Sequence, residues 1–140
     1  MFEDVTYITS GDYKWPIKCD LIVLEKAQET FGSIRKFEQM LMDCEYETNE
    51  NGENVLDDNG NPKIKAKLPD VSAVNTALYW MACEGRAVMA DEAKSDEMRT
   101  TVDKDKLLRS MDMPFMKLAR ILHEEFARCF VSKNEKTTQD

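Results

Sequence analysis

The chain has 140 residues, a net charge of −8 and a hydrophobic content of 42%. This length corresponds to one domain, and a chain of this size buries about two-thirds of its unfolded surface, enough for a core without disulfide or metal support. The balance of 27 acidic against 19 basic side chains argues against a nucleic-acid binder, which needs clustered Lys and Arg.

The first predicted element is a short β-hairpin. Val5–Thr9 consists only of β-branched and aromatic residues, and Lys14–Lys18 is a second candidate strand. Gly11 lies in the connection between them, as short hairpin loops require. Pro16 cannot donate to a strand ladder, so we expect the second strand at an edge or with a bulge.

Two short helices that meet at a bend are predicted next. Apolar residues recur at helical spacing over Leu21–Phe31 and again over Ile34–Cys44. Asp20 precedes the first helix as an N-cap. Gly32 ends it in a left-handed conformation, and Ser33 begins the second helix.

Glu45–Leu68 differs from the rest in its many Asn residues and few large apolar groups. Asn59-Gly60 is a strong turn signal, and Val55-Leu56 could pair with Ile64–Ala66 across it, so we interpret the segment as a solvated hairpin or a mobile loop. The stretch that begins at Glu47 resembles a calcium-binding loop but departs from it at the first, eighth and twelfth positions, which favours turns.

A third helix begins after Asp70 and carries a broad apolar stripe, typical of a helix buried on more than one side. Gly85 weakens this helix or permits a neighbour to approach closely. The polar stretch Ala90–Asp105 predicts a loop or frayed helix, and a short helix around Leu107 and Leu108 follows it.

Asp112 is the expected N-cap of the last helix, with Pro114 in its first turn. Lys133–Asp140 contains no apolar residue, and we expect residues 133–140 to be a disordered tail. No internal repeat is evident. We therefore predict a mainly α fold of the α+β class, with four to five helices and an N-terminal hairpin in one domain over residues 1–132, and a loop or hairpin insertion at 45–68.

No constellation of reactive side chains points to an enzyme. His123 is the single histidine, and the sequence that follows it lacks the second histidine of a zinc-binding H-E-x-x-H motif. The four cysteines, Cys19, Cys44, Cys83 and Cys129, are widely spaced and are expected to be free thiols. We predict no catalytic residue, no metal site and no cofactor.

The order of elements resembles the tail assembly chaperones of long-tailed bacteriophages and prophages. The similarity rests on the hairpin at 6–18, on the run C-D-L-I-V-L-E-K-A-Q-E-T-F-G-S-I-R-K-F, and on two later helical blocks. The matching residues are Leu21, Leu24, Glu25, Phe31, Gly32, Ile34 and Phe37. The segment 45–68 looks like an insertion relative to that family.

The resemblance implies a non-enzymatic protein of the host bacterial cytoplasm, not secreted, that binds the tape measure protein and aids assembly of tail tube subunits. A face built from the third and last helices would hold that partner. Its expected anchors are Trp80, Met81, Phe126 and Phe130, although the broadly apolar helix favours a place in the core for Tyr79 and Trp80. We expect no nucleic-acid binding, because the chain is acidic. We expect no membrane binding, because no apolar run approaches the ~20 residues of a membrane span.

The sequence is also compatible with three other properties. The chain could form a homo-oligomer. It could instead be a structural head–tail or tail component of the same phage, or a small acidic regulatory or interaction protein.

Overall fold

A computed structural model describes residues 5–95 and 101–131 of the chain. The predicted disordered tail at 133–140 lies outside these residues. The described part contains five helices, an N-terminal antiparallel hairpin and a second two-stranded sheet. The predicted mainly α fold of the α+β class is therefore confirmed, as is the second hairpin in the insertion. None of the helices within the described ranges is long and apolar enough to span a membrane.

The N-terminal hairpin pairs β1 (Thr6–Ser10) with β2 (Tyr13–Ile17), close to the predicted bounds. The two strands are antiparallel, with Pro16 opposite Tyr7. In a two-stranded sheet both strands are edges, and this position tolerates a proline.

The bend between the first two helices is formed as predicted. α1 (Leu21–Phe31) begins where the Asp20 carboxylate accepts from backbone N–H groups of the first turn. It ends at Gly32, whose φ of 94° suits a residue without a Cβ. The Ser33 hydroxyl then caps α2 (Ile34–Leu41). These caps are local signals, because each acts on a backbone N–H within three residues.

The long central helix α3 (Val71–Ala93) is capped by Asp70 and extends further than expected, since the first part of the predicted loop is helical. A Cβ placed on Gly85 would lie 2.3 Å from the carbonyl oxygen of Pro16. The glycine thus lets β2 lie directly on α3. Of the two roles considered for Gly85, the structure shows the close approach of a neighbour.

The prediction that Asp112 caps the last helix was wrong. α4 (Lys104–Ser110) is followed by α5 (Phe115–Arg128), and Pro114 holds the N-cap position of α5 without a side-chain bond. The Asp112 carboxylate instead accepts from the Ser10 hydroxyl and the Gly11 N–H, both at 2.9 Å. The Asp112 carboxylate therefore binds the turn of the N-terminal hairpin and does not cap α5.

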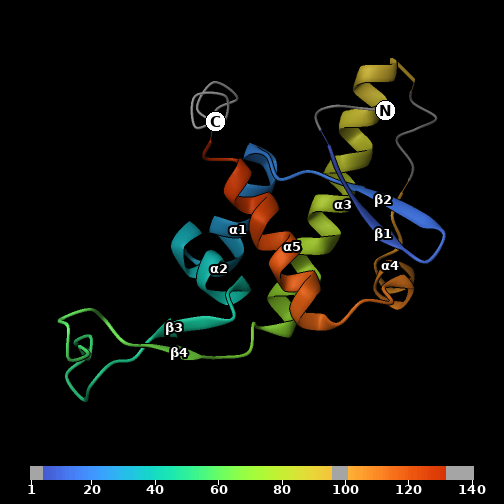
Figure 1. Cartoon of the computed structure of the whole chain (residues 1–140). Helices are drawn as coiled ribbons and strands as arrows, with labels where there is room; N and C mark the ends of the chain where they lie inside the picture. The colour runs from blue at the N-terminus through green and yellow to red at the C-terminus, as the bar shows by residue number, and fades with distance from the viewer. Residues whose placement is uncertain (1–4, 96–100, 132–140) are drawn as a thin grey trace, which may run out of the picture.

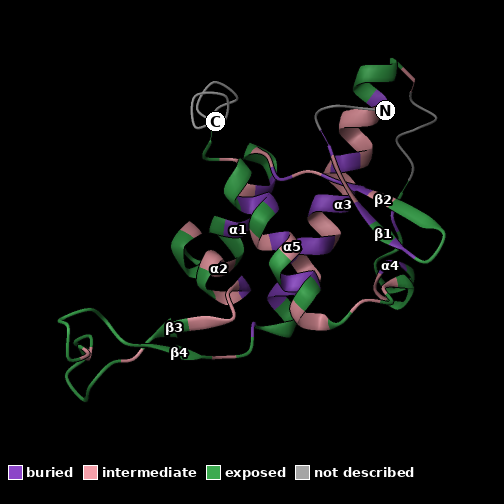
Figure 2. Ribbon diagram, viewed as in Figure 1, coloured by how far each residue is buried: buried purple, intermediate pink, exposed green. Residues whose placement is uncertain are grey.

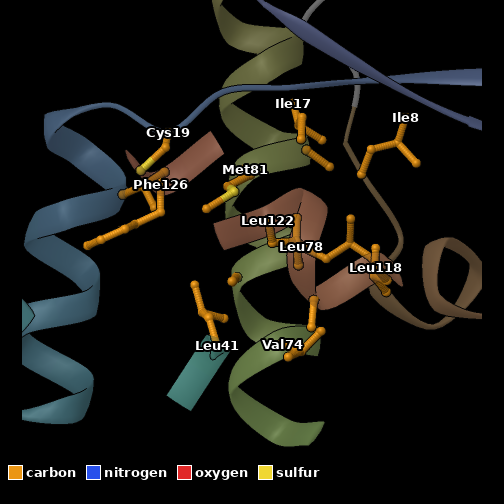
Figure 3. Packing of buried hydrophobic residues seen from close by; sticks show 14 of the residues in the cluster. Ile8, Ile17, Cys19, Leu41, Val74, Leu78, Met81, Leu118, Leu122 and Phe126 are labelled. Carbon is orange, nitrogen blue, oxygen red and sulfur yellow. The ribbon is translucent and has the colours of Figure 1, made fainter. Parts of the chain in front are cut away.

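The hydrophobic core lies where α3 and α5 meet the hairpin on one side and α1 and α2 on the other (Figures 1 and 3). Its largest fully buried side chains come from seven elements, which ties the hairpin and the helices into one packed unit. These side chains are Phe37, Ile8, Ile17, Leu41, Leu78, Met81, Leu107, Leu122, Val23 and Val74.

Residues 44–66 form an arm that extends away from the helices (Figure 1). The arm begins with β3 (Cys44–Tyr46) and ends with β4 (Ile64–Ala66), which pair antiparallel. The strand partner predicted for β4 was therefore wrong. Val55 instead lies further out, where its N–H donates to Glu47 and its carbonyl accepts from Lys63, both at 2.8 Å.

The arm also contains a short structural repeat that was not predicted from the sequence. In the loops 49–53 and 57–61, the first side chain accepts from the backbone N–H groups two and four residues later. The fourth residue in each loop is a glycine, Gly52 or Gly60, with φ of 80° and 82°. Asn49 and Asp57 use their side-chain oxygens to close these loops. The Asn, Asp and Gly residues that resemble a calcium-binding loop are therefore explained by turn formation.

Candidate functional site

The single histidine makes a contact between two helices. His123 Nε2 lies 3.0 Å from Glu38 Oε2, and its ring stacks on Phe126. This contact joins only one histidine and one carboxylate. Within residues 5–95 and 101–131, no group of three or more His, Cys, Asp or Glu side chains could hold a metal ion. The pair therefore links α5 to α2.

Among the described residues Glu125 is the one buried carboxylate, and hydrogen bonds inside the fold satisfy both of its oxygens. It is 3% exposed and accepts from the Thr6 hydroxyl at 2.5 Å and the Cys19 N–H at 3.0 Å. Arg128 pairs with it at 3.2 Å. Burial of a carboxylate is tolerated because each oxygen has a donor. Its helical spacing from Leu122 could have revealed its inward position.

The expected partner-binding anchors separate into two groups. Met81 is fully buried and Phe126 is 3% exposed. Neither can touch a partner in this fold, because α3 and α5 turn these side chains into the core, where Figure 3 shows both. Trp80 is half-buried beside Phe31, at 6.1 Å between ring centroids. Phe130, 58% exposed, is the one anchor that stands open to solvent.

Phe130 is one of four exposed large apolar residues at the neighbouring ends of α1 and α5, which we call the end patch: Leu21, Ile22, Phe130 and Val131. Leu21 is 81% exposed, the highest value among the large apolar side chains. The first turn of α1 lies beside the last turn of α5 (Figure 1), and both ends are solvent-exposed (Figure 2). The Cys129 thiol donates to the Cys19 carbonyl oxygen at 2.9 Å and so joins these two chain segments.

The arm carries a second exposed apolar surface. Cross-strand partners share a face of a sheet, so Tyr46 and Ile64 lie on the same face. Both are exposed. The opposite face is charged, with Lys65 and Glu45 paired at 3.6 Å. A groove of about 390 Å³ runs between the apolar face and the end of α2, where Met42 lines it.

Comparison with protein-family models, with curated proteins and with solved structures finds no match to this chain. Large apolar side chains that are open to water cost solvation free energy, and clusters of them mark surfaces that a partner covers.

Proposed function

We propose that the protein is a non-enzymatic tail assembly chaperone of a long-tailed phage or prophage, and that its end patch binds an amphipathic helix of the tape measure protein. The family resemblance of the sequence suggests this class. The observation that carries the proposal is the end patch, in which two helix ends expose four large apolar side chains.

The shape of the end patch suits a helical segment as its partner. Leu21 and Ile22 come from the start of α1, and Phe130 and Val131 follow the end of α5. An amphipathic helix presents apolar residues at i, i+3, i+4 and i+7, and this stripe can cover apolar groups contributed by two neighbouring elements. The net charge of −8 favours a partner helix whose flanks carry Lys or Arg.

The arm suits a different kind of partner. The inward-facing backbone bonds join Glu47 to Lys63 and Lys67 to Asp43, at 2.9 and 3.0 Å. In an antiparallel ladder hydrogen-bonded and non-hydrogen-bonded pairs alternate, so the Tyr46–Ile64 pair directs its N–H and C=O groups outward. For Tyr46 and Ile64, these groups lie on open strand edges beside exposed apolar side chains. We propose that the arm receives a strand of a tail tube subunit by edge addition.

The test is co-purification from cells that co-express the chain with the tape measure protein and the tail tube protein of the same phage. The end-patch variant is Leu21→Ser with Phe130→Ser, and the matched arm variant is Tyr46→Ser with Ile64→Ser. Each removes two exposed apolar side chains. We expect the end-patch variant to lose the tape measure protein and retain the tube protein, with the reverse for the arm variant.

Two results would contradict the proposal in different ways. Tape measure protein that co-purifies equally with both variants would place its binding site elsewhere on the chain. Failure of the wild-type chain to retain either protein would reject the chaperone function itself. Recovery of the chain in purified phage particles would favour the alternative of a structural tail component.

A further inference from the structure

Two of the four cysteines are in contact, although they lie far apart in the sequence. Cys19 lies in the connection between β2 and α1, and Cys129 is the C-cap of α5. The Cys129 thiol lies 2.9 Å from the Cys19 carbonyl oxygen, and its side chain packs against the core cluster that contains Cys19. Cys44 and Cys83 lie on the arm and on α3.

The two thiols have different surroundings. Cys129 is half-buried, whereas Cys19 is 4% exposed. The hydrogen bond from the Cys19 thiol lowers the pKa of Cys129, with a smaller contribution from Lys18, against the opposing effects of burial, Glu125 and Asp20. The same bond, together with burial, raises the pKa of Cys19. Thiolate character and access both make Cys129 the first of the pair to react.

We propose that Cys129 is an oxidation site for hydroperoxides, and that Cys19 resolves the oxidised form into an intramolecular disulfide. The inference goes beyond the chaperone function and does not depend on it. It stands on the contact between the two residues and on their unequal exposure.

The chemistry balances in two steps. The Cys129 thiolate attacks hydrogen peroxide, an S–O bond forms as the O–O bond breaks, and hydroxide leaves. Cys129 is then a sulfenic acid. The Cys19 sulfur attacks the Cys129 sulfur, an S–S bond forms, the S–O bond breaks, and the Cys19 proton leaves with the hydroxyl group as water. The two sulfurs lose two electrons, and the peroxide is reduced.

The disulfide would fix the region beside the end patch. Cys19 lies two residues before Leu21, and Cys129 directly precedes Phe130, so the bond would fasten the last turn of α5 to the first turn of α1. A cross-link over such a long loop restricts the unfolded chain strongly, and we expect the oxidised protein to unfold about 10 °C higher than the reduced protein.

The test uses the full chain and hydrogen peroxide at a small molar excess, followed by alkylation and peptide mapping with and without reductant. We expect a Cys19–Cys129 disulfide in the wild-type chain and in the Cys44→Ser and Cys83→Ser controls. Cys129→Ser should abolish it. Cys19→Ser should leave a sulfenic acid on Cys129 that a dimedone probe labels.

Three outcomes would overturn the proposal. One is oxidation of Cys44 or Cys83 ahead of Cys129. Another is formation of disulfides only between molecules, seen as dimers on a non-reducing gel. The third is an unreacted Cys129 when circular dichroism shows the chain to be folded, which separates a lack of reactivity from misfolding.

Discussion

The helical body and the arm are held together in different ways. The body relies on bonds between residues about a hundred positions apart, such as those that Thr6 donates to Glu125 and Ser10 donates to Asp112. The arm, residues 44–66, relies on neighbouring loops, and none of its residues, all of which the structure describes, is buried. We therefore expect the loss of one such contact to destabilise the body, and changes in the arm to leave the core intact.

The largest expected effect is at the contact between α3 and β2. In Gly85→Ala the new Cβ would lie within 3 Å of the Pro16 carbonyl group and the Ile17 nitrogen. These are backbone atoms, so the strand must move off the helix, and we expect a loss of about 3 kcal/mol in the free energy of unfolding by chemical denaturation. In the arm, Gly52→Ala strains a left-handed residue with open space around it and should leave global unfolding unchanged.

The buried carboxylate should come next in effect. Glu125→Ala removes the acceptor for Thr6 and for the Cys19 N–H. We expect a loss of about 2 to 3 kcal/mol in the free energy of unfolding, because a buried donor is left without a partner. The exposed neighbour offers a matched control, since Glu124→Ala should change stability by less than about 0.5 kcal/mol. Equal losses in the two variants would refute the structural role of Glu125.

The end patch should contribute little to folding. Leu21→Ser removes a side chain that is 81% exposed, and we expect its free energy of unfolding to stay within about 0.5 kcal/mol of the wild type. A loss of 2 kcal/mol or more in the isolated chain would mean that Leu21 packs in the core and is not free for a partner.

The smallest effect is expected from shortening the arm. Replacing residues 48–62 by Asn-Gly joins Glu47 to Lys63 by a two-residue turn that suits their hydrogen-bonded position. The thermal unfolding midpoint should stay within about 2 °C of the wild type, since none of the deleted residues is buried in the core. Cooperative unfolding at a much lower temperature would show that the arm supports the body.

The sequence predicted local features well because their causes are local. The caps at Asp20, Ser33 and Asp70 each act on a backbone N–H within three residues. The hairpin and the bend at Gly32 follow from the same short-range chemistry.

Other features could not be predicted because they depend on which segments meet in the fold. Asp112 bonds to the hairpin turn instead of its own helix, and β4 pairs with β3. Met81 and Phe126 match the pattern of interface anchors, but periodicity cannot state which side of a broadly apolar helix a neighbour covers. The exposure of Leu21 and Ile22 became visible only in the assembled structure.

The most direct test of the central claim is the dissociation constant of the chain for the tape measure protein, measured with the end-patch and arm variants side by side. We expect Leu21→Ser with Phe130→Ser to weaken binding at least about tenfold, since each buried apolar side chain contributes more than 1 kcal/mol. Tyr46→Ser with Ile64→Ser should bind like the wild type. Unchanged affinity in the end-patch variant would contradict the account.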